Sequence, residues 1–181
     1  MSHVDNIIST YLRATDAQHD AGMSWYDDTH AFASELSPGD VWRGAGVIAA
    51  FSPVCPWPRN VELARNAFLT GVATGHTAMF CGFAQRILDG ELTLDVLKGD
   101  KTRAFASAIA DPANSTIATI DRHAHDIAMG RIHTDKERKI GKRLFRTLSD
   151  AYVESAELVG VSVAQIQAIT WVAWREMHGI A

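Results

Sequence analysis

Apolar residues recur along this chain three and four positions apart, which is the spacing of one face of an α-helix. The first run of this kind consists of Val4, Ile7, Ile8, Tyr11 and Leu12. Glycine is a poor helix former and is common just past a helix end. We therefore expect one amphipathic helix over residues 3–20, with its end at Gly22.

The rest of the chain repeats this pattern with clear interruptions. Asp40 precedes an apolar run that begins at Val41, and aspartate is a common residue at the cap of a helix. Prolines interrupt helices, so the cluster of Pro53, Pro56 and Pro58 predicts a bend before a helix near Val61, Ala64 and Phe68. Further helical segments are expected at residues 76–89, 92–97, 101–110, 121–129, 136–147, 149–159 and 162–177.

No stretch alternates apolar and polar residues in the manner of a strand. The chain has 181 residues, of which 47% are apolar and 21% charged, and these values are typical of a packed protein. The sequence therefore predicts an all-α fold. We expect residues 41–181 to form the main helical domain, with residues 1–40 as accessory helices packed on it.

No apolar run approaches the roughly 18 residues that span a bilayer. The amino-terminal residues also lack the charged start and apolar centre of a secretion signal. We expect a cytoplasmic protein with no membrane partner. The two cysteines, Cys55 and Cys81, are too few for a disulfide framework or for structural zinc bound by thiolates.

Charge is distributed unevenly, although the formal net charge is −4. Residues 1–40 carry seven acidic side chains and one arginine, whereas residues 131–146 carry seven basic side chains and two acidic ones. A net negative charge argues against indiscriminate binding of polyanions. The uneven distribution nevertheless predicts one basic face.

A short apolar helix, a turn at Lys98, Gly99 and Asp100, and a second helix from Lys101 to Ala110 follow one another directly. A glycine in such a turn lets the backbone approach a phosphate, while the next helix directs free N–H groups at the anion. This arrangement can hold one DNA strand without reading its sequence. The alternative is an ordinary turn in which Gly99 ends the first helix as a cap.

About 20 residues later, Ile120, Asp121, Arg122 and His123 open another predicted helix. A glycine hairpin followed by a helix that starts with an apolar residue, Asp, any residue and His resembles the helix-hairpin-helix DNA glycosylase superfamily, the group of endonuclease III and 8-oxoguanine glycosylase. The resemblance implies a helix-hairpin-helix glycosylase-like bundle. It also implies that Asp121 lies at the mouth of a base pocket.

Two more stretches resemble the same superfamily. The segment FSPVCPWPRN, which contains Trp57 and Asn60, is similar to the early helix-loop-helix whose loop pushes side chains into the gap left by a flipped base. Near the carboxyl end, Gln167 and Trp171 lie four residues apart and resemble the glutamine and aromatic pair that holds the extruded base. The resemblance covers residues 43–177. It extends to small glycosylase-like proteins of actinobacterial phages, which implies the cytoplasm of an infected bacterium.

This sequence departs from the superfamily at two points. The usual hairpin has two glycines, whereas here Asp100 follows Gly99 and places a carboxylate near the expected phosphate. The cysteines that hold an iron–sulfur cluster in some members are absent, so we expect no cofactor. Lys101 and Thr102 resemble the Lys-Thr pair of the members that also cleave the strand, although the alignment needs a shortened turn.

The candidate catalytic residues each have a second interpretation. Asp121 can stabilise the sugar cation formed when the base leaves, and it can also cap its helix; the two roles are compatible. Lys101 can attack the sugar as an amine, but a phosphate contact is the simpler role, and it favours an enzyme without strand cleavage. His123 is either a partner of Asp121 or phosphate, or a buried polar residue of the helix.

The remaining site residues divide into a base pocket and a DNA-binding surface. Gln167, Trp171 and His123 form the candidate base pocket, although helix packing also explains the first two. Cations spaced along a helix can follow the DNA backbone, but they are also common on a solvated helix face. The candidate DNA contacts are Lys98, Gly99, Lys101, Trp57, Asn60, Arg138, Lys142 and Arg146.

We expect no metal site. Positions 123 and 125 do not share a helical face, and no motif with recognised metal-ligand spacing is present. His125 and Asp126 are expected to face differently from His123 and to be exposed.

The function hypothesis is therefore a monomeric enzyme that binds double-stranded DNA, flips a modified base and cleaves its N-glycosidic bond. Two alternatives remain open. One is a phage transferase derived from a glycosylase that modifies an activated thymine. The other is a DNA-binding protein without catalysis, which Asp100 and the net negative charge favour.

Overall fold

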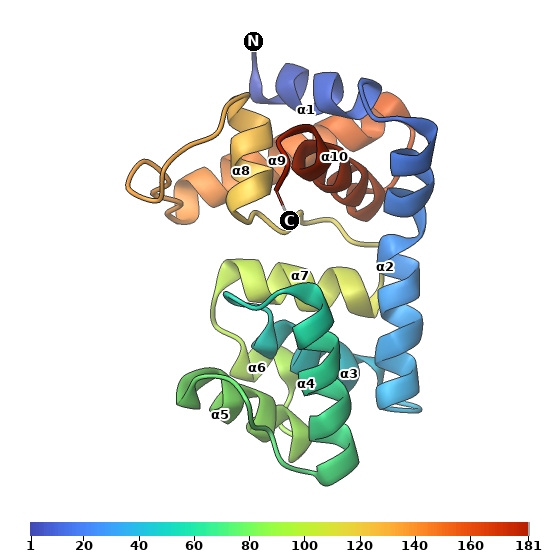
Figure 1. Ribbon diagram of the computed structural model, residues 1–181, viewed down its shortest axis with the longest axis vertical. Coiled ribbons are helices and arrows are strands. Elements are labelled where there is room, and N and C mark those ends of the chain that lie inside the picture. Colours follow the sequence, from blue (N-terminus) through green and yellow to red (C-terminus); the bar gives the residue numbers. More distant parts are fainter. Residues whose placement is uncertain (181) are drawn as a thin grey trace. The chain divides into compact units, whose positions relative to one another are not determined.

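The computed structural model describes residues 1–180, and over this range it contains α-helices and no strand (Figure 1), so the predicted all-α class is confirmed. The helices are α1 (His3–Leu12), α2 (Asp16–Leu36), α3 (Val41–Phe51), α4 (Trp57–Thr70), α5 (Ala78–Leu88), α6 (Thr93–Val96), α7 (Asp100–Ala110), α8 (Arg122–Met129), α9 (Lys142–Val159) and α10 (Val163–Met177).

The helices form two compact units. The terminal unit combines Met1–Tyr26 with Pro112–Ala181, and the central unit is Asp27–Asp111. These boundaries differ from the expected division into 1–40 and 41–181. The physical reason is that α1 contributes to the core of the terminal unit, where it packs against α8, α9 and α10.

The core of the terminal unit forms around α8, α9 and α10 and takes one face of α1. Its largest fully buried side chains come from all four helices, and burial of such side chains supplies most of the stabilisation of a helical unit. They include Ile7, Ile127, Leu148, Tyr152 and Ile166, and Ile120, which lies just before α8, belongs to the same core. The side chain of Asn6, on α1, donates a hydrogen bond to the carbonyl of Ala128 at 2.9 Å, which joins α1 to the end of α8.

Helix α3 is the centre of the central unit and is buried from Gly44 to Phe51. Asp40 caps it as predicted, since its side chain accepts a hydrogen bond from the N–H of Arg43 at 3.1 Å. The helix is apolar on all sides and packs against α4, α5, α6 and α7. The predicted bend at the proline cluster is also present, because α3 ends at Phe51 and α4 begins at Trp57.

The first predicted helix, residues 3–20 ending at Gly22, is wrong in both its continuity and its end. The helix is interrupted between α1 and α2. There the Gln18 side chain accepts from the N–H of Thr15 at 2.9 Å and the Thr15 hydroxyl accepts from the N–H of Gln18 at 3.3 Å, as in a capping box. Gly22 lies inside α2, and a Cβ atom there would be 2.4 Å from the Cα of Ile169. The glycine is needed for the close approach of α2 to α10.

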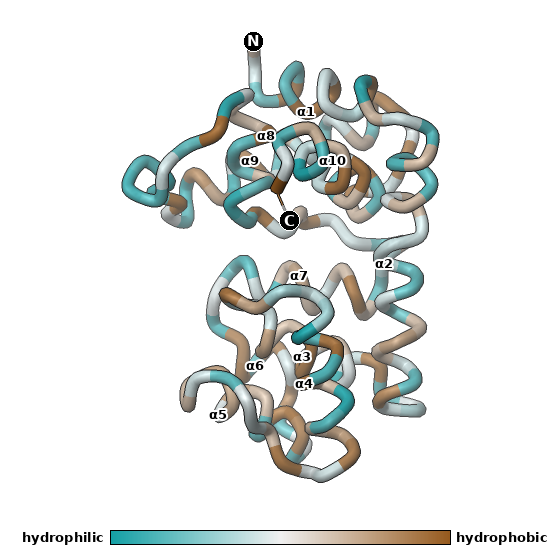
Figure 2. The backbone as a smooth tube through the Cα atoms, in the orientation of Figure 1, coloured by the Kyte–Doolittle hydropathy of each residue, from teal (hydrophilic) through white to brown (hydrophobic). Residues whose placement is uncertain are grey.

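The two helices expected at 136–147 and 149–159 are also different in the structure. Residues 130–141 form a non-helical segment, here called the basic loop, and α9 then runs without a break from Lys142 to Val159. The basic loop is largely hydrophilic in Figure 2. Within it, the side chain of Glu137 accepts hydrogen bonds from the N–H and hydroxyl of Thr134 at 2.7 and 2.8 Å. These bonds close a turn in place of a helix.

Among residues 1–180, no single helix has the length and apolar character to cross a membrane. Helices α9 and α10 satisfy those criteria only when taken as a pair, and the pair is bent by 98° at its break.

Candidate functional site

Asp121 lies at the amino end of α8, where it is the helix cap. Its Oδ1 atom accepts hydrogen bonds from the backbone N–H groups of His123 and Ala124 at 2.9 and 2.8 Å. Oδ2 takes no part in the cap, and the residue is half-buried. The capping role is therefore real, and it leaves the side chain partly accessible at a helix end that favours negative charge.

Aromatic and cationic side chains surround this end of α8. The ring of Trp171 lies 6.2 Å from the ring of His123 and 6.3 Å from that of Trp25, measured between centroids. The guanidinium of Arg175 lies over the Trp171 ring, 4.1 Å from its centroid. The structure thus brings together two of the three residues of the predicted base pocket, His123 and Trp171, and covers part of the tryptophan with a cation.

The His123 imidazole is buried, and its surroundings favour the uncharged form. Burial lowers its pKa below the ordinary value of 6.5; the Asp121 carboxylate acts in the opposite direction, and Arg122 and Arg175 add to the lowering. Arg122 Nε donates to His123 Nε2 at 3.1 Å, which requires that ring nitrogen to be unprotonated. His123 is therefore a neutral imidazole that borders the Asp121 site.

Gln167 lies on α10 and is almost fully buried, but its carbonyl oxygen already has a partner. Oε1 accepts a hydrogen bond from the backbone N–H of Thr119 at 2.8 Å. Thr119 is two residues before Asp121, so this bond fixes the segment that leads into the site. Tyr26 lies on the same network, and burial raises its pKa while hydrogen bonding with Thr119 and Gln167 acts to lower it.

The segment predicted to form the hairpin consists of α6, a turn and α7. Gly99 is the cap at the start of α7 and has a φ angle of −77°, so the alternative in which it ends the first helix is wrong. Lys98 and Gly99 are exposed, and Lys101 lies half-buried in the first turn of α7. Arg103 donates to the carbonyls of Leu94 and Leu97, which holds the two helices of the hairpin together.

The loop between α3 and α4 contains an exposed residue that the sequence did not single out. Val54 is 98% exposed and has a φ angle of 56°, a left-handed conformation that is strained for a β-branched residue. His76 Nε2 donates to the carbonyl of Pro53 at 2.9 Å, which joins the loop to the segment before α5. Trp57 is half-buried.

Asn60 is placed differently from an exposed DNA contact. It is 1% exposed, and its side chain donates to the carbonyl of Ile48 at 3.0 Å. This bond joins α4 to α3 in the core of the central unit. In this conformation Asn60 supports the fold of the central unit and presents nothing to a ligand.

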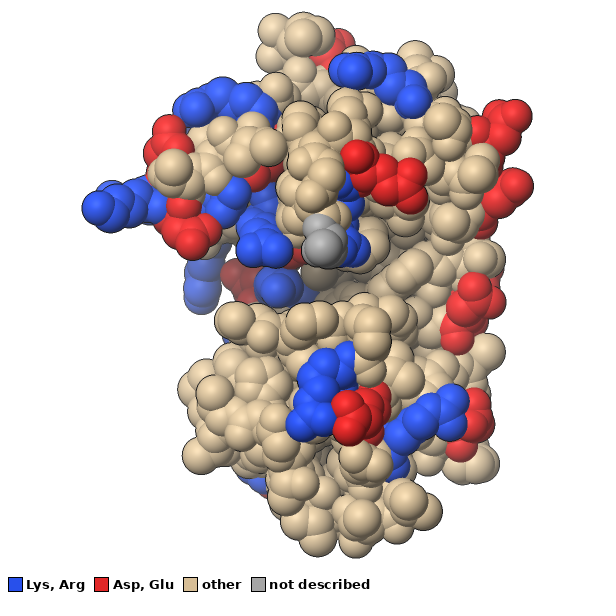
Figure 3. Space-filling view, viewed as in Figure 1, with Lys and Arg blue, Asp and Glu red and all other residues tan. Residues whose placement is uncertain are grey.

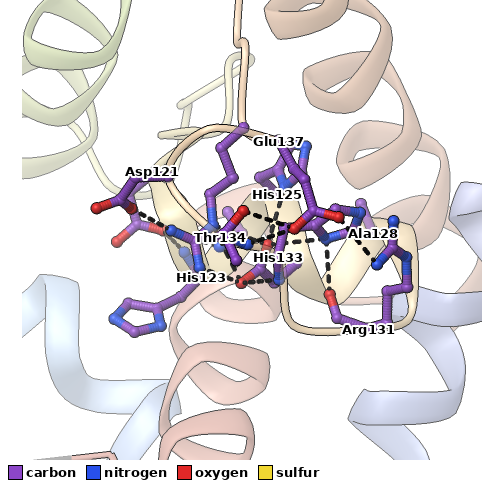
Figure 4. Close-up of polar contacts among 12 residues, drawn as sticks. Asp121, His123, His125, Ala128, Arg131, His133, Thr134 and Glu137 are labelled. Atoms are coloured by element: carbon purple, nitrogen blue, oxygen red, sulfur yellow. Dashed lines mark hydrogen bonds and ion pairs between the residues drawn. The ribbon is translucent and has the colours of Figure 1, made fainter.

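His125 and Asp126 are 1% and 2% exposed, so the expectation that they face solvent is wrong. They form the Asp126 cluster, which also contains His133 and Arg138. Nδ1 of His125 and Nδ1 of His133 lie 2.9 and 3.2 Å from Asp126 Oδ1. Figure 4 shows that Asp121 and His123 point away from this cluster.

Arg138 completes the Asp126 cluster from the basic loop. Its Nε donates to Oδ1 and its Nη2 to Oδ2 of Asp126, at 3.0 and 2.9 Å. Burial acts to raise the pKa of Asp126, but the hydrogen bonds from Arg138, from His125 and from the N–H of His133 outweigh it, and the pKa lies below its usual value. The carboxylate is thus a buried anion held by surrounding donors.

His125, Asp126 and His133 offer ligand atoms that all lie within 4.8 Å of one another, which is a donor set that transition metals use. The argument from helical faces did not anticipate this because His133 reaches the cluster from the basic loop. Arg138, however, neutralises Asp126 and occupies both of its oxygens. The arrangement is therefore self-sufficient as a hydrogen-bonded ion pair.

Cations gather at the basic loop and the start of α9, as the left side of Figure 3 shows. Two of the seven basic side chains there are paired, since Arg138 binds Asp126 and Asp135, and Arg131 contacts Glu137 at 3.5 Å. Over residues 1–180, no ion pair engages the other five, which are all exposed. These five, here called the free cations, are Lys136, Lys139, Lys142, Arg143 and Arg146.

The predicted site residues therefore separate into groups. Asp121, His123, Gln167 and Trp171 meet in the terminal unit. Lys98, Gly99 and Lys101 lie together at the start of α7, while Trp57 and Asn60 are in α4. Lys142 and Arg146 belong to the free cations, but Arg138 is only 13% exposed and is occupied by acidic partners. The sequence missed the Asp126 cluster, Tyr26 and Val54.

Comparison with known proteins identifies a family for this chain. No curated protein and no solved structure matches this chain. The model of one protein family matches residues 1–178. Because this match spans nearly the whole chain, the protein belongs to the family of unknown function DUF7178.

Proposed function

We propose that this protein binds duplex DNA and cleaves the N-glycosidic bond of an extruded base beside Asp121. The observation that carries the proposal is the half-buried Asp121 carboxylate at the amino end of α8, close to His123, whose ring in turn lies against the ring of Trp171. An accessible carboxylate next to aromatic rings is suited to a flipped base and its sugar. The resemblance to helix-hairpin-helix glycosylases supports the same role for this residue.

The proposed reaction is hydrolysis. The bond between C1′ of the sugar and the base nitrogen breaks, and its electron pair leaves with the base. Asp121 stabilises the positive charge that develops on the sugar, because a fixed carboxylate is worth more in a partly dry site than in water. Water then adds to C1′, and its proton passes to the carboxylate and on to solvent, while the base takes a proton from solvent.

Trp171 and Gln167 would hold the base before cleavage. The indole offers a face for stacking, although Arg175 already lies over one side of it. Gln167 Oε1 is engaged by Thr119, and the side chain also hydrogen bonds with Tyr26, so it would contact a base only by exchanging one of these partners. The main role of Gln167 is then to fix the segment that ends in Asp121.

Two groups of residues would contact the DNA backbone. The free cations can each neutralise a phosphate, and their attraction for DNA is weakened by salt. At the start of α7, Lys98 and Gly99 are exposed, and the free N–H groups of the helix favour an anion. Lys101, half-buried in the first turn, is assigned to the same phosphate contact and not to attack on the sugar.

The test is incubation of the protein with genomic DNA that carries diverse modified bases. Released bases and altered nucleosides are measured by mass spectrometry for the wild type and for Asp121→Asn. Asparagine is also a good helix cap, so this variant is expected to fold. Asp150→Asn, at an exposed position of α9, is the control with the same change in charge.

We expect free base from the wild type and from Asp150→Asn, and at least a 100-fold lower rate from Asp121→Asn, as for removal of other electrostatic stabilisers. Equal rates for Asp121→Asn and the wild type would reject Asp121 as the catalytic group. A heavier nucleoside in place of free base would identify a transferase.

The second candidate is a DNA-binding protein without base chemistry. Two observations favour it: Gln167 Oε1 already has a partner, and Arg175 covers part of the Trp171 ring. In that case duplex DNA binds, no base or nucleoside changes, and Asp121→Asn binds DNA as tightly as the wild type or more tightly.

A further inference from the structure

Some of the free cations lie on a helix and others lie in a loop. Lys142, Arg143 and Arg146 lie on α9, whose helical hydrogen bonds hold them in place. Lys136 and Lys139 lie in the basic loop, which has no helix to fix them. A lysine on an unrestrained loop loses more conformational entropy on binding a phosphate than one on a fixed backbone. The order of this loop therefore matters for DNA binding.

The Asp126 cluster is what attaches the basic loop to α8. Arg138 Nε and Nη2 hold the Asp126 carboxylate, and the backbone N–H of His133 donates to Oδ2 at 3.3 Å. The Asp126 side chain thus holds the loop at two points, positions 133 and 138, which lie on either side of Lys136. The backbone N–H of Arg131 also donates to the backbone carbonyl of Asp126 at 3.1 Å. Lys139 directly follows the second attachment point. Both points depend on one carboxylate that is 2% exposed.

We propose that Asp126 is a positioning residue for DNA binding: it holds the basic loop in the conformation that presents Lys136 and Lys139 to the phosphates beside the cations of α9. This inference rests on the DNA binding of the proposed function, and it assigns Asp126 no contact with DNA. Arg138, which the sequence suggested as a phosphate contact, is then an anchor of the loop.

The sign of the effect separates positioning from simple electrostatics. Asp126→Asn removes a negative charge, and by long-range electrostatics alone this strengthens the binding of a polyanion. Positioning predicts the opposite result, because the amide holds Arg138 and His133 less firmly. Asp135→Asn is the matched control, since Asp135 also pairs with Arg138, at 2.6 Å, but its side chain is 97% exposed.

The experiment measures the affinity for a 20-base-pair duplex over a range of salt concentrations. Asp126→Asn is expected to weaken binding on the order of 10-fold and to lower the slope of log affinity against log salt by about 2, one for each loop lysine. Asp135→Asn is expected to bind as tightly as the wild type or more tightly. Unchanged or stronger binding by folded Asp126→Asn overturns the inference.

A double-mutant cycle tests whether the effect acts through the loop lysines. In a Lys136→Gln/Lys139→Gln background, Asp126→Asn is expected to cause no further loss, because the residues that it positions no longer carry charge. A further loss of equal size would show that Asp126 acts elsewhere and would overturn the inference.

Asp126→Asn removes a buried charge and can prevent folding, so Arg138→Gln provides an independent route. If Arg138 anchors the loop, its loss also removes the contribution of Lys136 and Lys139 to DNA binding. Arg138→Gln then lowers the salt slope by about 2 in the wild type and by 0 in the Lys136→Gln/Lys139→Gln background. As a direct phosphate contact, it lowers the slope by about 1 in both backgrounds, which would overturn the inference.

The outcomes also separate this inference from the proposed function. A wild-type protein that does not bind the duplex overturns both. A wild type that binds DNA but releases no base leaves the role of Asp126 standing on its own measurements. Amide hydrogen exchange gives a second readout, since Arg138→Gln is expected to speed exchange in residues 131–141 and to leave α10 unchanged.

Discussion

The backbone N–H of Thr119 donates to Oε1 of Gln167 at 2.8 Å, and both groups are buried. This bond joins the middle of α10 to the segment that ends in Asp121. Gln167, which the sequence suggested as a residue that reads a base, therefore also stabilises the structure. The position of the candidate catalytic carboxylate depends on it.

Gln167→Met tests the contribution of this hydrogen bond to stability. Methionine has a similar size but offers no acceptor, so the buried N–H of Thr119 loses its partner. We expect the free energy of unfolding to fall by about 1–3 kcal/mol, the penalty for an unsatisfied buried donor. Chemical denaturation followed by fluorescence measures it.

The matched control is Gln18→Met. Gln18 Oε1 also accepts a hydrogen bond from a backbone N–H, that of Thr15, at 2.9 Å, but this bond is exposed. Water can replace the lost acceptor there, so we expect a loss of less than about 1 kcal/mol. Equal losses for the two variants would show that the Gln167 bond has no special importance.

His123 makes stability depend on pH. Its folded-state pKa is lowered, so between that pKa and the unfolded value near 6.5 the unfolded chain binds more protons. The stabilisation is fully present above 6.5 and is lost as the pH falls through the folded-state pKa. Protonation of Nε2 also breaks the bond from Arg122.

We therefore expect the free energy of unfolding to fall for the wild type as the pH is lowered from about 7.5 to about 5.5, and to fall less for His123→Gln, which cannot titrate. Urea denaturation at each pH gives the difference between the two proteins. A difference that stays constant with pH would rule out a lowered pKa for His123.

Gly22→Ala tests the close approach of α2 and α10. The new Cβ would lie 2.4 Å from the Cα of Ile169, so one helix must shift. We expect a loss of about 1–3 kcal/mol from overpacking, despite the better helix propensity of alanine.

Gly82→Ala is the control for this change. Gly82 lies within α5, and a Cβ there meets nothing within 4 Å. Here helix propensity alone acts, and we expect a gain of about 1 kcal/mol in stability. Thermal melts followed by circular dichroism compare the two substitutions, and a loss at both positions would contradict the packing argument for Gly22.

The sequence predicted the features that depend on neighbouring residues. The capping of α3 by Asp40 and of α8 by Asp121 requires only groups two or three residues away. Apolar spacing likewise identified most of the helices, because it reports which face of each helix is buried. The roles of these residues in DNA chemistry stay predictions.

Features that depend on distant partners were beyond the sequence. Gly22 was expected to end a helix because nothing near it shows that Ile169 lies against it. Asp126 meets Arg138 only because the intervening residues fold as a loop, whereas helical spacing predicted a helix from residue 136. The capping box at Thr15 and Gln18, in contrast, depends on residues only three positions apart and was readable from the sequence.

Val54, in the loop between α3 and α4, has a strained backbone and an exposed side chain, so a substitution there tests the role of this loop. Its left-handed backbone is unfavourable for valine, whereas asparagine tolerates this conformation. Val54→Asn is therefore expected to raise the free energy of unfolding by about 1 kcal/mol. If this loop enters the gap left by a flipped base, the loss of an apolar tip also lowers the rate of base release.

The opposite signs of these two effects distinguish function from folding. Val72→Asn is the control, because Val72 is 53% exposed and has an ordinary backbone, so the same change in polarity is expected to alter neither stability nor rate by much. Unfolding by urea and single-turnover base release are measured on the same preparations. A variant at position 54 that is more stable and equally fast would show that the strained valine serves no purpose in base extrusion.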